Sequence, residues 1–287
     1  MYKILTKKVL NPTVSQMEIE APLIAAKAKP GQFIILRVDS DGERIPLTVA
    51  GTDKARGTVK IIFPVVGATT EALNHKEAGD SIADFVGPLG VASKLENLKK
   101  VCIVGGGVGC AIALPIAEAL HETGADVTSI IGFRSKDLVI LEDEFKAASN
   151  RLRVLTDDGS YGEHGNVTLP LKELLESGER FDEIITIGPL IMMKFVVLTA
   201  KPFDIPCTVS MNPIMIDGTG MCGGCRLTLN QNGKRVMKFA CVDGPDFNGY
   251  EVDFDEAMRR GKMYTDFERA AHEHICNLFR KAETEGV

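Results

Sequence analysis

The chain has 287 residues, of which 45% are hydrophobic and 25% are charged. These values are typical of a globular protein with two or three domains. A formal net charge of −6 argues against nonspecific nucleic-acid binding, and no apolar run approaches the roughly 18–20 residues of a membrane span. Seven cysteines, an odd number, and no secretory leader after Met1 indicate a reducing compartment, for which we expect the cytoplasm.

Residues 1–98 are expected to form a small antiparallel β-barrel. Alternating or β-branched apolar runs recur at short spacing and are separated by turns that contain glycine, a pattern typical of small barrels. The expected elements include strands at 14–19, 32–38 and 58–66, and one helix at 70–75.

From residue 99 to residue 206 the pattern changes to alternating strands and helices. Strands are expected at 101–104, 126–132, 153–155 and 183–187, and helices at 112–123, 142–148 and 169–177. Strands that alternate with helices in this way predict a parallel, doubly wound sheet.

The turn between the first of these strands and its helix is rich in glycine. It reads Gly105-Gly106-Gly107-Val108-Gly109. Glycines at this place allow a pyrophosphate to approach the backbone N–H groups and the partial positive charge of a helix N-terminus. Because the pattern is not a strict G-x-G-x-x-G, the alternative is a tight turn from strand to helix without a ligand.

The residues that follow the second and third of these strands give opposite indications of whether NAD or NADP is bound. Arg134 and Lys136 favour a 2′-phosphate, and hence NADP. Asp157 and Asp158 would repel a phosphate and could accept ribose hydroxyls, although Asp158 also suits a simple turn. The residues therefore leave the choice between NAD and NADP open.

Cys222 and Cys225 have C-x-x-C spacing, and Cys241 follows at a distance. A plant-type [2Fe–2S] cluster uses C-x₄-C-x₂-C and a distant fourth cysteine. Asp217 occupies the place of the first cysteine, and a carboxylate can bind iron through oxygen. We therefore expect these four residues to hold a [2Fe–2S] cluster. The alternatives are a zinc knuckle completed by Cys207, a redox dithiol and a disulfide.

Two loops of the expected barrel are further candidates for phosphate binding. Arg44 can pair with a phosphate and Thr48 can hydrogen-bond a ring nitrogen, whereas the alternative is a solvated arginine beside a strand. The loop from Gly67 to Thr70 enters a helix and can bind a pyrophosphate. Its alternative is an ordinary helix start that Thr69 or Thr70 caps.

Residues 251–287 are expected to form a C-terminal helical tail. Apolar residues recur there at near-helical spacing: Met258, Met263, Tyr264, Phe267, Ala271, Ile275, Leu278 and Phe279. Such a stripe either packs on its own domain or docks onto another subunit.

The order of these motifs resembles the ferredoxin–NADP reductase superfamily, in the branch of dihydroorotate dehydrogenase and sulfide dehydrogenase electron-transfer subunits. Within this branch the chain is most similar to small subunits of the electron-bifurcating transhydrogenase family, the NADH-dependent reduced ferredoxin:NADP⁺ oxidoreductases. The motifs that carry the resemblance span nearly the whole chain: PGQFI at 30–34, RIPLT at 44–48, GPLG at 87–90, GGGVG at 105–109, TDDGS at 156–160, IGP at 187–189, and the run 210–225.

The resemblance implies an FAD-binding barrel over residues 1–98 and an NAD-binding α/β domain over residues 99–206. It further implies a [2Fe–2S] domain over residues 207–250, followed by the helical tail. Electrons would pass between NAD(H), FAD and the cluster. They would then pass to or from a larger subunit with flavin and [4Fe–4S] clusters, which would connect the chain to ferredoxin and NADP(H).

The resemblance also implies a role for Thr48, which should face the isoalloxazine edge of the flavin and tune its reactivity. The superfamily motif R-x-Y-[ST] is altered here, because Arg44 stands one residue early and Leu47 replaces the aromatic residue. Pro46 and Leu47 complete the expected flavin-binding run.

Gly188 and Pro189 should border the nicotinamide. An aspartate at position 217 is expected in the bifurcating family and favours it over the dihydroorotate family. The alternatives are an electron-transfer subunit of dihydroorotate dehydrogenase or sulfide dehydrogenase, and a zinc-stabilised binding module without enzymatic activity.

Overall fold

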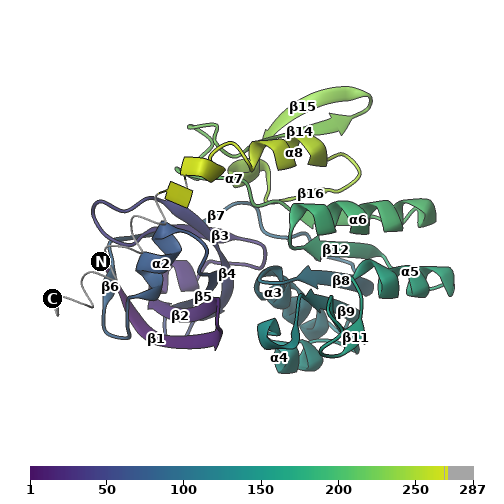
Figure 1. Ribbon diagram of the computed structural model, residues 1–287, viewed down its shortest axis with the longest axis horizontal. Helices are drawn as coiled ribbons and strands as arrows, with labels where there is room; N and C mark the ends of the chain where they lie inside the picture. Colours follow the sequence, from purple (N-terminus) through teal and green to yellow (C-terminus); the bar gives the residue numbers. More distant parts are fainter. Residues whose placement is uncertain (268, 271–287) are drawn as a thin grey trace.

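Seven strands from the first part of the chain form an antiparallel sheet that curls into a nearly closed barrel (Figure 1). The structure is a computed structural model that describes residues 1–267, 269 and 270. The strand order is β6-β1-β2-β5-β4-β3-β7. The elements of this part are β1 (Tyr2–Asn11), β2 (Val14–Glu20), α1 (Pro22–Ala25), β3 (Phe33–Arg37), β4 (Ile45–Asp53), β5 (Thr58–Pro64), α2 (Ala68–Asn74), β6 (Ser81–Ile82) and β7 (Asp84–Leu89).

Strand β3 buries both of its faces, because it lies between two hydrophobic cores. Ile34 and Leu36 are fully buried in the barrel core, where Leu47 of β4 packs beside them. Phe33 and Ile35 point to the opposite face, as alternation along a strand requires. They belong to a second core that includes residues of the central sheet and of the C-terminal segment.

The central sheet has the strand order β11-β10-β9-β8-β12-β13-β16, and all its strands run parallel except β16 at the edge. The order β10-β9-β8-β12-β13 is that of doubly wound nucleotide-binding folds, which confirms the predicted α/β class. The strands are β8 (Lys100–Gly106), β9 (Asp126–Phe133), β10 (Arg151–Thr156), β11 (Glu163–His164), β12 (Glu183–Ile187), β13 (Cys207–Ser210) and β16 (Asp246–Asn248).

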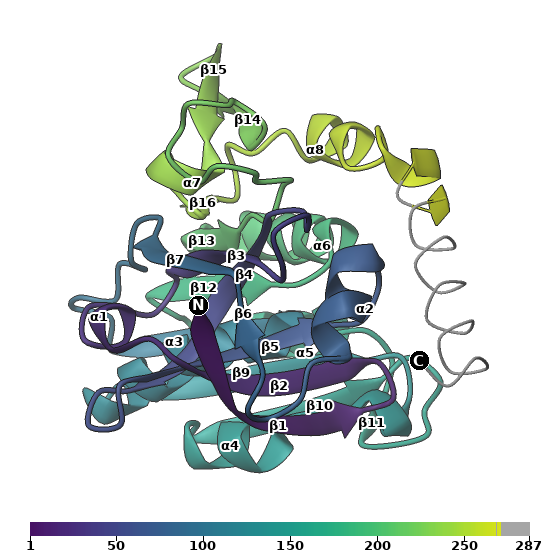
Figure 2. The same cartoon turned by 90° about the vertical axis from the view of Figure 1, so that its left-hand side faces the viewer.

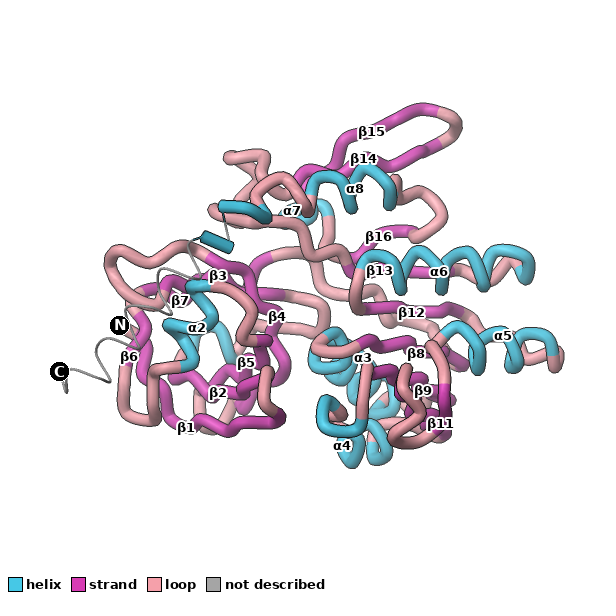
Figure 3. The backbone as a smooth tube through the Cα atoms, viewed as in Figure 1, coloured by secondary structure: helices cyan, strands magenta, loops and turns pink. Residues whose placement is uncertain are grey.

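Helices cover both faces of this sheet (Figure 3). Strand β8 shows why: Val101 and Ile103 share a core with α3 and α4, whereas Cys102 and Val104 share a core with α5 and α6. The helical elements of this part are α3 (Gly109–Glu122), the 3₁₀ turn η1 (Lys136–Leu138), α4 (Glu142–Ala147), α5 (Thr168–Glu176), α6 (Leu190–Ala200) and the 3₁₀ turn η2 (Lys201–Phe203).

The chain leaves the central sheet after β13 and returns to it at β16. The boundary expected between residues 206 and 207 therefore coincides with the start of a sheet strand. The sheet takes in both ends of the segment because Val209 and Phe247 are buried in its core. Between β13 and β16 the chain forms β14 (Arg226–Gln231), β15 (Lys234–Phe239) and α7 (Ala240–Asp243). Helix α8 (Phe254–Arg260) follows β16.

The barrel and the central sheet share a core along α3. Val14, Ala50 and Ile62 of the barrel belong to the same buried cluster as Ile116 and Leu120 of that helix. Figure 2 views the molecule from the barrel side and shows the β14–β15 hairpin projecting beyond both units. Within the described ranges, no helix is long and apolar enough to cross a membrane.

The predicted helical tail is described only in part. Helix α8 begins at Phe254, and the side chain of Asp253 caps it by accepting the N–H of Glu256. Farther along, Met263, Tyr264 and Phe267 are exposed. The rest of the predicted apolar stripe lies outside the described residues: Ala271, Ile275, Leu278 and Phe279.

Candidate functional site

The barrel face outside β3 and β4 carries the predicted flavin-contacting residues. Phe33 pairs with Thr48 and Ile35 pairs with Pro46, so these four side chains share the outer face. Thr48 and Pro46 are half-buried there. Leu47 points the other way and packs against the barrel core, so its side chain is not on the face that the prediction assigned to the cofactor.

Arg44 precedes β4 and keeps most of its hydrogen-bonding capacity. Its guanidinium lies 3.9 Å from Asp84 Oδ2, and its side chain is 47% exposed. That carboxylate accepts a shorter hydrogen bond of 2.7 Å from Arg37 Nε, which is therefore its principal partner. A guanidinium has five N–H donors, so Arg44 retains donors for a phosphate.

The loop that enters α2 is shaped by Thr70. Its hydroxyl oxygen accepts the N–H groups of Val66 and Gly67, both at 3.0 Å. The N-cap is therefore Gly67, not Thr69 or Thr70 as the alternative interpretation expected, and Thr70 stabilises the loop from within the helix. Among the described residues, apart from the chain neighbours of Gly67, no atom lies within 4 Å of a Cβ at this position, so this side of the loop is open to a ligand.

Two glycines of the β8–α3 loop are required by packing alone. A Cβ at Gly105 would come within 2.9 Å of Cys110 Sγ. A Cβ at Gly109 would collide with the carbonyl oxygen of Ile187 in β12. These two positions therefore serve the close packing of helix against strand, whether or not a nucleotide binds.

The other two glycines of this loop differ in their surroundings, because Gly107 faces open space and Gly106 is covered. Gly107 has φ +55, and in the part of the chain that the structure describes no atom beyond its chain neighbours lies within 4 Å of a Cβ built there. Gly106 and Gly188 lie side by side at the ends of β8 and β12, where Met192 covers them, and Pro189 begins the turn into α6. The strand order reverses between β8 and β12, and dinucleotides bind at such crevices. The loop therefore fits a pyrophosphate at Gly107 and a nicotinamide beside Gly188.

The ends of the adjacent strands β9 and β10 hold the residues that bear on nucleotide choice. Arg134 and Asp157 are exposed. Asp158 Oδ1 accepts the hydroxyl of Ser160 at 2.6 Å and its N–H at 2.9 Å, and these bonds lower the pKa of the carboxyl. The hydroxyl of Ser160 in turn accepts the N–H of Lys136. A charged carboxylate is thus held at the strand end.

Cys225 and Cys241 form the inner half of the candidate metal centre. Their sulfur atoms lie 3.1 Å apart, both side chains are buried, and both thiols are free. Burial raises the pKa of the Cys241 thiol to about 12, and the neighbouring Cys225 thiol adds to this rise. A bound metal cation would deprotonate such a thiol outright. Two thiolates on one tetrahedral metal lie roughly 3.8 Å apart, so only a small outward shift is needed.

Asp217 and Cys222 form the outer half. Asp217 Oδ2 accepts the N–H groups of Met221 and Cys222 at 3.2 and 3.1 Å, and its Oδ1 accepts the Thr219 hydroxyl at 2.5 Å. The Thr219 bond, followed by the backbone bonds, lowers the pKa of the carboxyl. A charged oxygen donor therefore stands beside an exposed thiol.

Two pairs of donors suit a two-iron cluster better than a single zinc ion. No group of three or more His, Cys, Asp or Glu side chains that could hold one metal ion is found in residues 1–267, 269 and 270. Structural zinc needs four ligands around one ion, whereas a [2Fe–2S] cluster divides its four ligands between two irons. Cys207, the suggested fourth zinc ligand, is buried in β13 between β12 and β16.

The loop that contains Asp217 (the cluster loop) lies directly against the outer face of β3 and β4, which is the face predicted to hold the flavin and is called the flavin face below. Gly218 has φ +78, and a Cβ there would come within 2.8 Å of the Cδ1 atoms of both Ile35 and Leu89. Ile35 shares its face with Pro46 and Thr48. The structure thus brings the predicted iron ligands and the predicted flavin residues to one junction.

Comparisons with known proteins agree with this arrangement. Residues 212–253 match the model of the iron–sulfur cluster binding domain of dihydroorotate dehydrogenase B. The Thermotoga maritima homolog of the dihydroorotate dehydrogenase B (NAD⁺) electron transfer subunit is 46% identical over 281 residues, which cover 98% of each chain. The chain belongs to the family of dihydroorotate dehydrogenase B electron-transfer subunits. A further member of this family, from Streptococcus pneumoniae serotype 4, is 34% identical over 85% of this chain and 97% of its own length.

Solved structures place this electron-transfer subunit in the predicted branch. The structure of NADH-dependent reduced ferredoxin–NADP oxidoreductase, described for its insights into flavin-based electron bifurcation, matches with a TM-score of 0.89. Its identity is 46%, over 96% of this chain and 98% of that chain. The ferredoxin reductase of carbazole 1,9a-dioxygenase shares the fold, with a TM-score of 0.62 and 20% identity over 71% of this chain and 65% of that chain. The predicted superfamily and barrel-plus-α/β architecture are confirmed.

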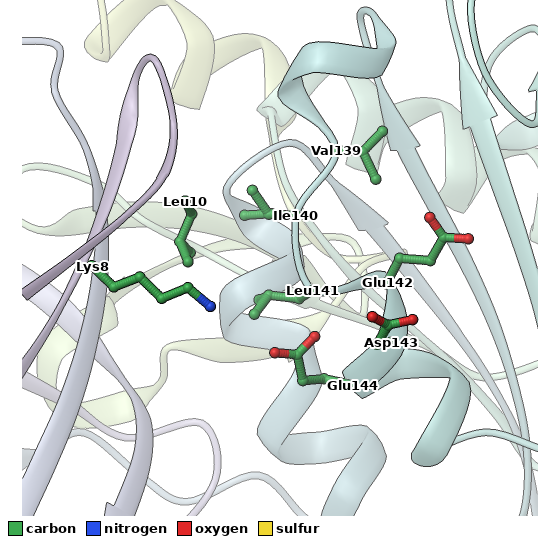
Figure 4. A pocket seen from close by; sticks show the side chains of 8 residues that line it. All are labelled: Lys8, Leu10, Val139, Ile140, Leu141, Glu142, Asp143 and Glu144. Carbon is green, nitrogen blue, oxygen red and sulfur yellow. The ribbon is translucent and has the colours of Figure 1, made fainter.

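The electron-transfer subunit also has a cleft of about 260 Å³ away from these residues (Figure 4). It lies between Lys8 and Leu10 of β1 and the segment 139–144, which leads into α4. None of the predicted cofactor or metal residues lines it.

Met192, which covers Gly106 in the candidate nucleotide site, was not predicted from the sequence, because a methionine in an apolar helix carries no functional signal.

Replacing Asp217 with cysteine should leave a cluster whose EPR spectrum is changed. Oxygen is a harder and less covalent donor than sulfur, so exchanging the donor alters the g-values and the reduction potential. The reduced variant and the unmodified subunit are compared by EPR at equal iron content. Identical spectra would remove Asp217 from the ligand set and leave it as a loop-stabilising residue only.

Proposed function

We propose that this subunit carries electrons between NAD(H), FAD and a [2Fe–2S] cluster, and exchanges them with the larger subunit of a bifurcating NADH/ferredoxin:NADP⁺ transhydrogenase. The observation that carries the proposal is the contact of Gly218 with Ile35 and Leu89, because it joins the cluster loop to the face that bears Thr48. A bound flavin would convert between the two electrons that a hydride carries and the single electrons that a cluster accepts. Neither nicotinamide nor cluster performs this conversion.

The residues of the subunit bind and orient these groups. Gly107 leaves room for the pyrophosphate of NAD(H), and Gly188 with Pro189 borders the nicotinamide ring. Arg44 pairs with a flavin phosphate, and the Thr48 hydroxyl stands at the ring edge. None of these residues acts as a general acid or base, because hydride and electron transfer depend on distance and orientation.

An apolar rim around the cluster ligands supports docking of the larger subunit. Met221 is 89% exposed and Ile216 is 53% exposed, and Val242 is also exposed beside Cys241. Clustered exposed apolar side chains mark protein–protein contact surfaces. Met263 of the predicted tail is also exposed, and we include it in the proposed contact. The described cysteines of the subunit are free thiols, which suit a reducing compartment, and we propose that the subunit is located in the cytoplasm.

A second candidate function is the electron-transfer subunit of an NAD-dependent dihydroorotate dehydrogenase. It is favoured by the match of residues 212–253 to the iron–sulfur domain of that enzyme. The two candidates use the same cofactors and differ in the partner. The native complex is therefore purified and assayed for NADPH-driven ferredoxin reduction that requires NAD⁺, and separately for dihydroorotate oxidation.

The cofactor part of the proposal is tested on the subunit alone. We expect about one FAD and two irons per chain, and visible absorption that NADH bleaches under anaerobic conditions. A colourless protein that contains zinc would support the alternative of a binding module without enzymatic activity. Activity with dihydroorotate, without NAD⁺-dependent ferredoxin reduction, would support the second candidate.

We expect the subunit to prefer NADH over NADPH by about tenfold or more in kcat/KM. The reason is the pair Asp157 and Asp158 at the end of β10, where Asp158 is held charged and would repel a 2′-phosphate. Diaphorase kinetics with both nucleotides measure the ratio. A tenfold advantage for NADPH would instead assign Arg134 as the residue that binds the 2′-phosphate.

A further inference from the structure

Asp246 stands where the three parts of the molecule meet. Its Oδ2 accepts the hydroxyl of Ser93 at 2.5 Å, and its backbone pairs with Ser210 across the β13–β16 ladder. Its Oδ1 is buried and has no hydrogen-bond partner within the described structure. Buried polar atoms without partners are rare, so this carboxyl has a specific environment that simple packing does not require.

The partners of Asp246 come from different parts of the chain. Ser93 lies in the linker that follows the last barrel strand, β7, and Ser210 ends β13 of the central sheet. Asp246 itself opens β16, five positions after the predicted iron ligand Cys241. Asp246 therefore connects the exit of the cluster segment to the barrel linker through its carboxyl and to the central sheet through its backbone.

Backbone hydrogen bonds beside Asp246 run between the same three parts. The N–H of Val91 donates to the carbonyl of Gly244 at 2.7 Å, and the N–H of Met211 donates to the carbonyl of Pro245 at 2.9 Å. The segment 244–246 is thus held between the barrel linker and the end of β13. Any displacement of this segment would move Cys241, because Cys241 lies in α7, which ends directly before the segment.

We propose that Asp246 is a positioning residue that holds the cluster segment against the flavin face of the barrel. This inference rests on the proposed function, because it assumes that electrons cross between the flavin face and the cluster. Electron transfer between two bound groups depends on their separation, so a loosened segment slows this one step. Binding of NADH and hydride transfer take place at the β8–β12 crevice and do not depend on the bond to Ser93.

Asp246 forms no ion pair in the part of the chain that the structure describes. Burial raises the pKa of Asp246, and the hydrogen bond from Ser93 only partly opposes this rise. The folded protein holds the proton to higher pH than the unfolded chain does, so stability falls as pH rises between the two pKa values. An asparagine at this position keeps the hydrogen-bonding capacity without that loss.

The test compares Asp246→Ala and Asp246→Asn in the protein with its cofactors bound. Stopped-flow absorption separates flavin reduction by NADH from the later reduction of the cluster, and amide hydrogen exchange follows residues 241–249. For Asp246→Ala we expect exchange in this segment to be about tenfold faster and cluster reduction about tenfold slower, as loss of a buried hydrogen-bonded group predicts. Flavin reduction should be unchanged, and Asp246→Asn should resemble the unmodified protein in both measurements.

Asp182→Ala is the matched control. Asp182 is exposed and accepts the N–H groups of Lys99 and Lys100 at 2.7 and 2.8 Å, so this variant also removes an aspartate whose carboxyl accepts hydrogen bonds. These bonds lie within the central sheet, and the control should alter neither segment exchange nor cluster reduction. The proposal is wrong if Asp246→Ala leaves exchange over 241–249 unchanged. It is also wrong if Asp246→Asn is as impaired as Asp246→Ala, because the asparagine oxygen can still accept the Ser93 hydroxyl. Exchange is read without electron transfer, so a failure of the proposed function is seen separately.

Discussion

Replacing Cys241 with alanine should abolish the cluster and confine electrons to the flavin. Cys241 and Cys225 form the buried thiol pair, and loss of one thiolate leaves an iron with a single protein ligand. We expect iron to fall from about two per chain to near zero, with passage of electrons to a one-electron partner reduced by about 100-fold or more. Iron analysis, EPR of the reduced protein and NADH diaphorase assays measure these effects, and diaphorase activity should persist.

Cys207→Ala is the control for this experiment. It also removes a buried thiol, but from β13 in the central sheet, and it should keep the full iron content. Full iron in Cys241→Ala would exclude Cys241 as a ligand. Loss of metal in Cys207→Ala would instead support the zinc site that the spacing of the cysteines allowed.

Replacing Gly107 with alanine should raise the KM for NADH by about tenfold or more, because it places a methyl group where the pyrophosphate approaches the backbone. Gly107 faces open space, so the methyl group meets no atom of the described residues beyond its chain neighbours, and its effect falls on the ligand. Steady-state kinetics measure the KM. The flavin content should not change, since the barrel is untouched.

The backbone strain of this substitution needs its own control. Gly107 has φ +55, where a residue with a Cβ is disfavoured. Gly124, at the other end of α3, has φ +84 and is equally open, so Gly124→Ala introduces similar strain away from the crevice. If both variants raise the KM for NADH to the same extent, strain alone explains the effect and the pyrophosphate site is elsewhere.

The fold was predicted well wherever local patterns are strong. The change from two-residue alternation to alternating strands and helices near residue 99 marked the two main units, and both are present. The end of the second unit was less clear in the sequence. Cys207–Ser210 is a short strand whose place in the sheet depends on pairing with β12, and such pairing leaves no signal in four residues.

The candidate site was predicted as residue types and only partly as geometry. The glycine-rich loop was recognised, but only the structure separates Gly107, which is open, from Gly105 and Gly109, which packing requires. Leu47 was expected at the cofactor, yet strand alternation and the barrel core turn it inward. The cap of α2 is Gly67, because Thr70 directs its hydroxyl to the loop backbone.

The sequence by itself determined the chemistry that is available: a two-domain pattern, a nucleotide loop, and Asp217 with three cysteines at cluster spacing. These signals are local, since spacing and periodicity depend on neighbours along the chain. Only the tertiary structure decided that Gly218 lies on Ile35 and that Asp246 meets Ser93. Contacts between residues so distant in sequence follow from how preformed surfaces pack, and packing depends on the shapes of all partners together.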